Sequence, residues 1–321
     1  MATNDFLVFG GGAGANVIPQ VTYSGLAART AGFASGVAQS AQLNKVWRQS
    51  SIMSAVLAQF VSDLTGQDVL DDGTSVTILG NLKIAVQKQA PGRLLRTTVY
   101  RNNAGTLQAS INGGAFANAS STFTAQALTT AVDVEVQGAA GGSGGTTTCT
   151  ASQVSQSGGS GSGAYSRGYF TSGFNGVPVT VGTAGPAGTA GGGNGGNGGT
   201  SSFGSLLTAP GGSGSTGAAA SNVTTFFGGG VGGVPGVGGY INSAGTYGTV
   251  GINIGGTIGI GGNGAPSVFG GGGPPQATTT GPGNVGPSYG AGAGGALTIP
   301  NGTGSSGSQG AYGVVIVREY A

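Results

Sequence analysis

The sequence has no histidine, one cysteine and few charged residues among its 321 positions. Without histidine, Ser-His-Asp and Cys-His catalysis are excluded. The single cysteine, Cys149, excludes a disulfide framework within the chain and a cysteine-based zinc site. The net charge of +2 gives no basic patch, so we do not expect nucleic acid as a partner. No metal or other cofactor is predicted.

Targeting signals are also lacking. The N-terminal residues MATNDFLVFGGG have no basic region followed by a long apolar region, as a secretory signal would. No apolar run reaches transmembrane length without Gly or polar breaks. We therefore expect synthesis in a cytoplasm, without export by the secretory route and without membrane insertion.

Glycine is abundant, with 74 residues, and it is concentrated where charge is missing. From Val136 to Val317 the only charged side chain is Arg167. Disordered chains are typically rich in charge and poor in apolar residues, whereas this half keeps Val, Ile, Phe and Tyr. The composition therefore favours an ordered glycine-rich structure over a flexible linker.

The glycines follow a period of three. Residues 182–199 read GTA GPA GTA GGG NGG NGG, residues 229–240 read GGV GGV PGV GGY, and the chain around 255–263 reads GGT IGI GGN. Three residues per turn is the repeat of a polyproline II helix, which has no internal hydrogen bonds. Collagen requires an unbroken repeat, and this one breaks every few triplets. The pattern predicts short polyglycine-II segments that run back and forth and bond sideways.

The entropy lost on ordering so many glycines predicts self-association. Glycine loses more conformational freedom on folding than any other residue, and it buries little apolar surface in return. Such a domain needs dense backbone hydrogen bonding, a hydrophobic seam or a core shared between chains. We therefore expect an oligomer.

One helix is predicted in the N-terminal part, with Ser35 or Ser40 as its cap and Gly66 as its stop. Its apolar residues are spaced alternately by three and four, as on a coiled-coil seam. A helix packed within its own domain and a helix that self-associates both remain open. The predicted oligomerisation residues are Leu43, Val46, Met53, Leu57, Phe60 and Leu64.

The middle of the chain is predicted to be β-structure. Asp71-Asp72-Gly73 marks a turn with β-rich flanks, SINGGAF carries an Asn-Gly hairpin signal, and LLRTTVYR and VDVEVQ alternate. These segments form either a small β-domain or the entry strands of the glycine-rich part. The predicted fold class is mixed, mostly β and irregular. The expected domains are an N-terminal arm and helix over 1–66, a small β-domain over 67–137, and a glycine-rich domain over 138–321 closed by β-strands.

The C-terminal half resembles the glycine-rich domain that ends many tailed-bacteriophage tail-fibre proteins. Five pieces occur in that family's order: VDVEVQGAAGGSGG, GSGAYSRGYF, VPVTVGTAGPAG, GGTSSFGSLLTAPGG and GAYGVVIVREYA. The N-terminal stretch SGVAQSAQLNKVWRQSSIMSAVLAQFVSDLTGQDVLDDGT is similar to the leading module of phage and prophage tail fibres.

This resemblance implies a virion structural protein, assembled in the host cytoplasm and located in the tail fibre or tail tip. It implies an N-terminal part that docks to tail or baseplate proteins. It also implies a homotrimer, whose glycine scaffold presents loops to a bacterial receptor such as a pilus, an outer-membrane protein or a polysaccharide.

Receptor contact is expected from aromatic side chains that flank Gly/Pro turns, because exposed aromatics supply rigid contact area. The alternative is that they form the hydrophobic seam, and this is favoured for Phe203, Tyr312 and Tyr320 in strand-like pieces. The candidate receptor-binding residues are Phe226, Phe227, Tyr240, Tyr247, Phe269 and Tyr289.

An enzyme is not expected. Glycosidases use paired carboxylates, and no carboxylate lies inside the glycine-rich region. Asp133 and Glu135 share one face of a strand, where pairing with Arg or Lys is the simpler role. Two other functions stay open: a purely structural tail or baseplate connector, and an ice-binding glycine-rich protein.

Overall fold

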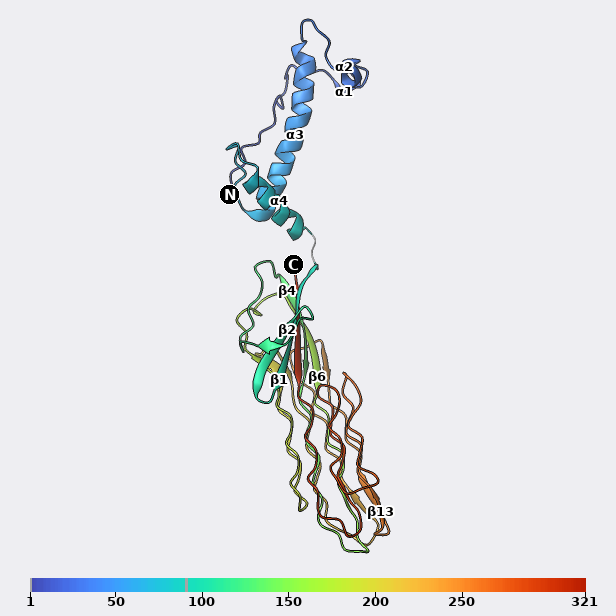
Figure 1. The fold of residues 1–321 in the computed structure, drawn as a ribbon. Helices are drawn as coiled ribbons and strands as arrows, with labels where there is room; N and C mark the ends of the chain where they lie inside the picture. The colour runs from blue at the N-terminus through green and yellow to red at the C-terminus, as the bar shows by residue number, and fades with distance from the viewer. Residues whose placement is uncertain (1, 90–91) are drawn as a thin grey trace. The chain divides into compact units, whose positions relative to one another are not determined.

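The computed structural model describes residues 2–89 and 92–321, which divide into two units, Met1–Pro91 and Gly92–Ala321. The first unit is helical and the second is made of β-strands and irregular extended segments (Figure 1). The mixed, mostly β and irregular fold class is therefore confirmed. The expected boundaries at 66 and 137 differ from this division. The strands before residue 137 belong to the glycine-rich unit, as one of the two sequence interpretations held.

The first unit is built on one long helix. The helices are α1 (Gln20–Ser24), α2 (Ala28–Ala31), α3 (Ser40–Thr65) and α4 (Val76–Lys88). Gly66 ends α3 as predicted, since it adopts φ +68° and its N–H donates to the Ser62 carbonyl over 2.9 Å. The predicted N-cap is wrong, because Ser40 is the first helical residue and Gln39 precedes it without a side-chain cap.

The predicted β-structure after Asp72 is also wrong, because Val76–Lys88 is the helix α4. Ile78, Leu82 and Ala85 recur at spacings of four and three, so they share one face of that helix. This face packs on α3, around the buried side chains Ala58, Val61, Val69 and Ala85. The β-branched residues of the segment misled the sequence prediction because tertiary packing decides between the two states.

The second unit contains all the strands. They are β1 (Leu94–Asn103), β2 (Thr106–Ile111), β3 (Ala117–Asn118), β4 (Ala131–Gln137), β5 (Ser155–Gln156), β6 (Tyr165–Phe170), β7 (Val179–Thr180), β8 (Ser201–Phe203), β9 (Leu207–Ala209), β10 (Thr225–Phe227), β11 (Ile241–Ser243), β12 (Gly251–Ile254), β13 (Ile258–Ile260), β14 (Leu297–Thr298) and β15 (Val314–Tyr320). The predicted Asn-Gly turn lies between β2 and β3, with φ +50° at Asn112 and +77° at Gly113.

The main sheet has seven strands in the order β11-β6-β4-β15-β1-β2-β3. Its inner face carries Val132, Val134 and Val136 of β4, which pack with Phe203 and Leu207 of the three-stranded sheet β7-β8-β9. The alternate residues of β4 lie on the opposite face of the sheet, where Asp133 is also buried. There Asp133 pairs with Arg167 over 2.6 Å, and Glu135 pairs with Arg318 over 2.5 Å. The prediction that these two carboxylates serve ion pairs is therefore confirmed.

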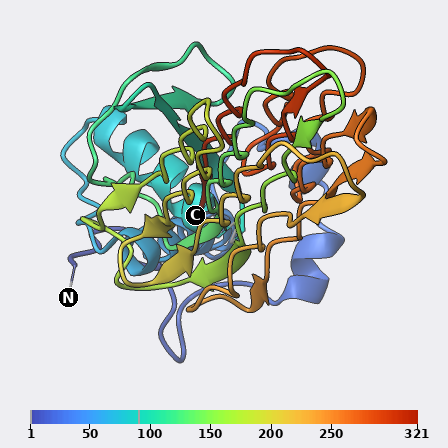
Figure 2. The ribbon, with the colours of Figure 1, turned by 90° about the horizontal axis from the view of Figure 1, so that it is seen from below.

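Beyond the sheet, the strands continue as extended segments that are neither helix nor strand, apart from β5 at Ser155–Gln156. Figure 1 shows them running side by side away from the sheet, and Figure 2 shows them nearly end-on. We call the end with the seven-stranded sheet the sheet end and the opposite end, where β13 lies, the glycine end. The extended segments comprise 138–147, 155–164, 181–190, 192–200, 210–218, 228–237, 244–250, 261–266, 271–276, 282–286, 290–296 and 303–313.

Segment 138–147, here the first central segment, donates backbone hydrogen bonds in a three-residue rotation. Every third N–H turns to the same neighbour, and three neighbours are served in turn, except that Gly144 N donates to the Ser215 hydroxyl of segment 210–218 over 2.9 Å. The bonds to 303–313 are Ala140 N to Ala311 O, Ser143 N to Ser308 O and Thr146 N to Ser305 O; those to 192–200 are Ala139 N to Gly199 O, Gly142 N to Gly196 O and Gly145 N to Gly193 O; those to 155–164 are Gly138 N to Ala164 O and Gly141 N to Gly161 O. All span 2.8–3.1 Å.

Other neighbours donate to this segment's carbonyls with the same rotation. Residues of 181–190 donate to Ala140 and Ser143, and residues of 210–218 donate to Ala139 and Gly142. The second central segment, 155–164, is surrounded in the same manner. Buried backbone groups must be paired, and here the partners come from neighbouring segments instead of from the segment itself.

Glycine is needed in the central segments because the neighbours approach so closely. A Cβ atom at Gly142 would lie 2.1 Å from the Pro186 carbonyl oxygen, and one at Gly141 would lie 2.2 Å from Ser213. The remaining face of the segment accepts small side chains, as Ala140, Ser143 and Thr146 show. In the sequence G-A-A-G-G-S-G-G-T of residues 138–146, small side chains therefore recur at every third position, and Ala139 is the one residue outside that face that carries a side chain.

Two of the triplet runs contain a turn or a strand in addition to extended segments. The run 182–199 reverses at Gly191 and Gly192, which adopt φ +96° and +82°, and its two halves bond to each other. In the run 255–263, residues 258–260 form strand β13 paired with β12. Positive φ favours glycine, so some glycines of the repeat serve as turns.

Candidate functional site

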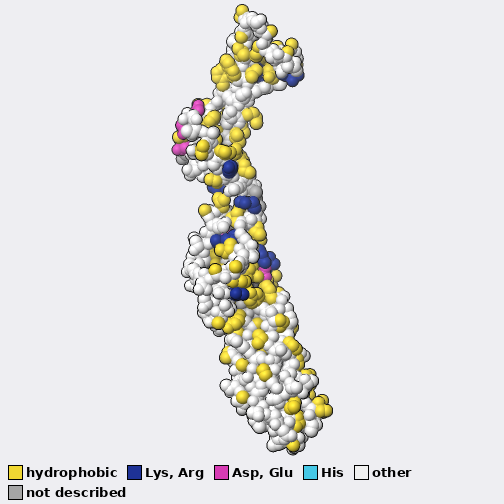
Figure 3. All heavy atoms as spheres, in the orientation of Figure 1, with side chains coloured by type: hydrophobic (Ala, Val, Ile, Leu, Met, Phe, Trp, Pro, Cys, Tyr) yellow, Lys and Arg dark blue, Asp and Glu magenta, His cyan; other side chains and the backbone are white. Residues whose placement is uncertain are grey.

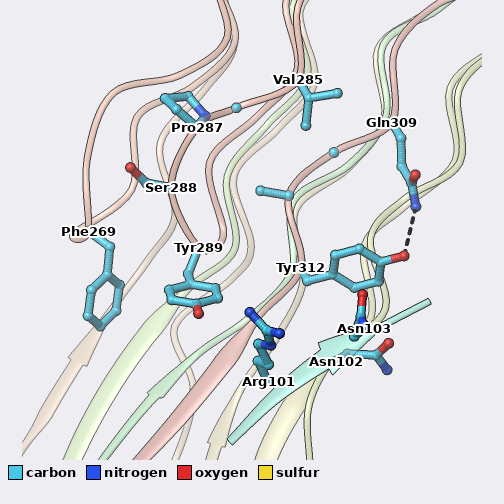
Figure 4. Close-up of a pocket in the computed structure, with 13 residues that line it drawn as sticks. Arg101, Asn102, Asn103, Phe269, Val285, Pro287, Ser288, Tyr289, Gln309 and Tyr312 are labelled. Carbon is cyan, nitrogen blue, oxygen red and sulfur yellow. Dashed lines mark hydrogen bonds between the residues drawn. The ribbon is translucent and has the colours of Figure 1, made fainter. Parts of the chain in front are cut away.

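A cavity of about 670 Å³ lies at the sheet end of the second unit, where two turns of the glycine segments and the residues before β15 meet β1. Its volume is within the range of small-molecule binding sites. Figure 4 shows its side chains converging on one space. The lining residues are Arg101, Asn102, Asn103, Phe269, Val285, Gly286, Pro287, Ser288, Tyr289, Gln309, Gly310, Ala311 and Tyr312.

Hydrogen bonds hold the turns that form this cavity. The Ser267 hydroxyl donates to the Tyr289 carbonyl over 2.7 Å, joining the turn at 267–270 to the turn at 287–290. Gly290 N donates to the Tyr312 carbonyl over 2.8 Å, which ties the second turn to the residues before β15. The cavity is thus built by the backbone before any ligand arrives.

Aromatic rings form one wall. Phe269 and Tyr289 lie edge to face with ring centroids 6.3 Å apart, and Phe269 makes the same kind of contact with Tyr165 of β6 at 6.3 Å. Such pairs are favourable beyond the area that they bury. The three rings therefore support one another, and Figure 4 shows Tyr312 across the cavity from Tyr289.

Arg101 supplies the positive charge of the cavity. Its Nε and Nη2 donate to Gln108 Oε1 over 3.1 and 3.0 Å, and its guanidinium lies 3.8 Å from the centre of the Phe116 ring. No Asp or Glu lines the cavity, and no ion pair in the described residues includes Arg101. Stacking and hydrogen bonds fix this cation in place without neutralising it.

The six predicted receptor-binding aromatics do not form one site. Phe269 and Tyr289 meet in the cavity, whereas Phe226 and Phe227 lie in β10, which pairs with β12 of the hairpin at the glycine end. Phe226 is 66% exposed, and Phe227 is half-buried. Tyr240 and Tyr247 are 61% and 70% exposed at separate positions, next to β11 and in segment 244–250.

The exposed residues at the glycine end form a second, apolar patch. Together with Phe226 they include Val223, Ile254, Ile258 and Ile260. No charged residue belongs to these strands. Figure 3 shows yellow side chains gathered there, with white backbone and polar atoms over most of the visible glycine segments.

Several residues of the cavity were missed from the sequence. Arg101, Asn102 and Asn103 belong to a strand 160 or more positions away from the turns that they meet, and no local pattern links them. Tyr312 was assigned to the hydrophobic seam, yet it is half-exposed and lines the cavity. Phe203, by contrast, is fully buried, as the same reasoning expected.

The predicted helical seam is split within the first unit. Phe60 and Leu64 pack against the core around Val61. Met53 and Leu57 are 69% and 49% exposed and, with Val56 and Phe60, line a shallow hollow on α3. Leu43 and Val46 are half-buried near the start of the same helix.

The described residues contain no group of side chains that could hold a metal ion. No cluster of three or more His, Cys, Asp or Glu side chains occurs among residues 2–89 and 92–321. The one strongly perturbed acidic group on the sheet is the Tyr165 phenol, whose pKa is raised by burial and then by its 2.9 Å hydrogen bond to Glu135. In the same part of the chain, no helix has the length and apolar character to cross a membrane.

No protein-family model matches the chain, and no curated protein sequence matches it.

Proposed function

We propose that the extended segments of the second unit are polyglycine-II helices and that their bundle is a rigid scaffold. The support is the three-residue rotation of donors around segment 138–147, which is the repeat of this helix. Because each segment bonds to several neighbours, no single segment can move without breaking bonds to the others.

We propose further that the chain is a non-enzymatic receptor-binding protein of a phage tail fibre. In this proposal the first unit attaches to tail or baseplate proteins, and the second unit binds a receptor on the bacterial surface. The protein belongs to the virion as a homotrimer, after assembly in the host cytoplasm. One observation carries the proposal: a scaffold nearly free of charge holds preformed turns that bear Phe269 and Tyr289, and it exposes Phe226 and Tyr247 at other positions.

Homotrimer formation is assigned to the exposed residues of α3. Met53, Val56 and Leu57 present apolar side chains to solvent on a 26-residue helix. Apolar residues repeated every three and four positions are the pattern through which helices associate. A second and third copy of α3 would cover them.

The test is a particle in which the chain ends at residue 91, so that the whole second unit is deleted. Receptor binding predicts particles that assemble but adsorb to host cells at least about tenfold less, which is a difference of about 1.4 kcal/mol in binding free energy. The structural-connector alternative predicts incomplete particles. Complete particles that adsorb normally would contradict the receptor-binding proposal.

A further inference from the structure

The cavity at the sheet end has the chemical character of a carbohydrate site. Sugars combine apolar C–H faces with rings of hydroxyl groups, so they need a flat apolar surface next to amides and hydroxyls. Binding sites generally join apolar walls to a few placed polar groups. The cavity offers both.

The apolar surface is provided by Tyr289 and Tyr312. Both are half-buried, so each ring is held in the wall while part of it faces the cavity. Tyr289 is fixed by Phe269 and by the bond from Ser267 to its carbonyl. A sugar ring can lie on a tyrosine face held in this way without ordering it first, which lowers the entropic cost of binding.

The polar groups come from amide side chains. Asn102 Oδ1 accepts from Gly105 N over 2.8 Å, which fixes this side chain at the edge of the cavity, and Asn103 lies next to the Tyr312 ring (Figure 4). Gln309 Nε2 donates a long hydrogen bond of 3.5 Å to the Tyr312 hydroxyl. The Gln309 side-chain oxygen takes no part in this bond, so it can accept a hydrogen bond from a ligand hydroxyl. Figure 4 shows Asn102, Asn103 and Gln309 on the same side of the cavity as Tyr312.

Arg101 adds a preference for a negative charge. Figure 4 shows its guanidinium between the rings of Tyr289 and Tyr312. Gln108 occupies its Nε and Nη2, and no described residue accepts a hydrogen bond from its Nη1. A guanidinium pairs well with a carboxylate, and the lining contains no acidic residue that would compete.

We infer that this cavity binds an acidic saccharide, with a sugar ring on Tyr289 or Tyr312, its hydroxyls on the amide side chains and its carboxylate on Arg101. The inference rests on the proposed function, since it names the chemical class of the receptor. It places that receptor at the sheet end of the second unit and not on the apolar patch around Phe226.

The test uses the purified full chain and three probes, N-acetylneuraminic acid, digalacturonic acid and glucuronic acid, each beside its methyl ester. Binding is measured by ligand-observed NMR titration. We expect at least one acid to bind, with its uncharged ester bound about tenfold more weakly. Arg101→Gln should weaken binding of that acid by a similar factor and leave the ester unchanged. Tyr289→Ala should weaken both.

Two controls separate binding from folding. Lys83→Gln removes an equal charge from an exposed position of the first unit and should leave every affinity unchanged. Arg101→Gln also removes the packing of the guanidinium on Phe116. Arg101→Lys loses that packing but keeps the positive charge, so it should bind the acid better than Arg101→Gln does. Equal binding of acid and ester, an Arg101→Gln variant that binds like the unaltered chain, or no binding of any acid below about 10 mM would overturn the inference.

The outcome is independent of the adsorption experiment. Saccharide binding uses no cells and no particles, so its failure leaves receptor binding by another surface of the second unit intact. Conversely, if the chain binds the acid in solution but truncated particles adsorb normally, the saccharide site stands and the receptor-binding proposal is contradicted.

Discussion

The hydroxyl of Ser160 donates a 2.5 Å hydrogen bond to the carbonyl of Gly141. The same oxygen accepts from Ala293 N over 2.7 Å, so one buried serine joins three glycine segments. Ser157 repeats the arrangement one turn earlier, donating to Gly144 O over 2.7 Å and accepting from Ala296 N over 2.9 Å. The carbonyls of Gly141 and Gly144 thus receive their hydrogen bonds from serine hydroxyls of the second central segment.

This relationship predicts the cost of removing the Ser160 hydroxyl. Ser160→Ala would leave the Gly141 carbonyl and the Ala293 amide short of a partner in a dry interior. We expect a loss of about 2 kcal/mol in the free energy of unfolding, measured by urea denaturation. Ser306→Ala, at an exposed position of a neighbouring segment, should change it by less than about 0.5 kcal/mol. Equal stabilities of the two variants would show that the hydroxyl bridge contributes nothing.

Adding one methyl group to a central segment should destabilise the second unit. In Gly142→Ala the new Cβ would lie 2.1 Å from the Pro186 carbonyl oxygen, so at least one segment must shift. We expect a loss of about 3 kcal/mol or more in unfolding free energy, measured by thermal and urea unfolding. Gly228→Ala is the matched control, since nothing lies within 4 Å of a Cβ at that position. If both variants unfold alike, close packing around Gly142 is refuted.

Alkaline pH should destabilise the second unit through Tyr165. Burial, strengthened by the hydrogen bond to Glu135, raises the pKa of this phenol above its ordinary value of 10.0. The unfolded chain then releases the proton at a lower pH than the folded chain does. The stabilisation is complete below pH about 10 and is lost as pH rises further.

The measurement is unfolding free energy across pH about 9 to 11. Tyr165→Phe has no proton to release there, so its stability should fall less steeply with pH, although it loses about 1 kcal/mol at neutral pH with the Glu135 bond. Tyr169→Phe, at an exposed position on the same strand, should retain the slope of the unaltered chain. Parallel curves for the unaltered chain and Tyr165→Phe would exclude Tyr165 as the source.

The homotrimer proposal predicts a particle of three times the 30.3 kDa chain mass in sedimentation equilibrium. Leu57→Asp places a charge on the exposed apolar side of α3 and should shift the protein to monomer, because burying an unpaired charge between helices is costly. Val76→Asp, at the exposed start of α4, is the control and should remain trimeric. A monomeric unaltered chain at micromolar concentration would disprove association through α3.

Local sequence patterns predicted several helices, strands and turns correctly. The three-four spacing before Gly66 predicted α3, the alternation of LLRTTVYR and VDVEVQ predicted β1 and β4, and Asn112-Gly113 predicted a hairpin turn. Each depends on neighbours within a few positions. The helix α4 was missed because Val76, Ile78 and Ile84 favour strands, and its packing on α3 decided otherwise.

The candidate site was predictable only in part. Phe269 and Tyr289 were chosen because they flank glycine turns, and they do meet in the cavity. Nothing in the sequence around Arg101 shows that two turns more than 160 residues later lie over it. The pairing of β1 with β15 brings Arg101 and the turns together. It places Arg101 opposite Val314, close to Tyr312, whose carbonyl accepts the hydrogen bond from Gly290 of the second turn.

By itself the sequence determined that the C-terminal half is nearly without charge, rich in glycine and organised in triplets, and that histidine-dependent catalysis is excluded. The tertiary structure decided which glycines are turns and which allow close approach, and which serines complete the backbone bonding. Segments of this kind form no hydrogen bonds within themselves, so their order and partners are fixed only when distant parts of the chain meet.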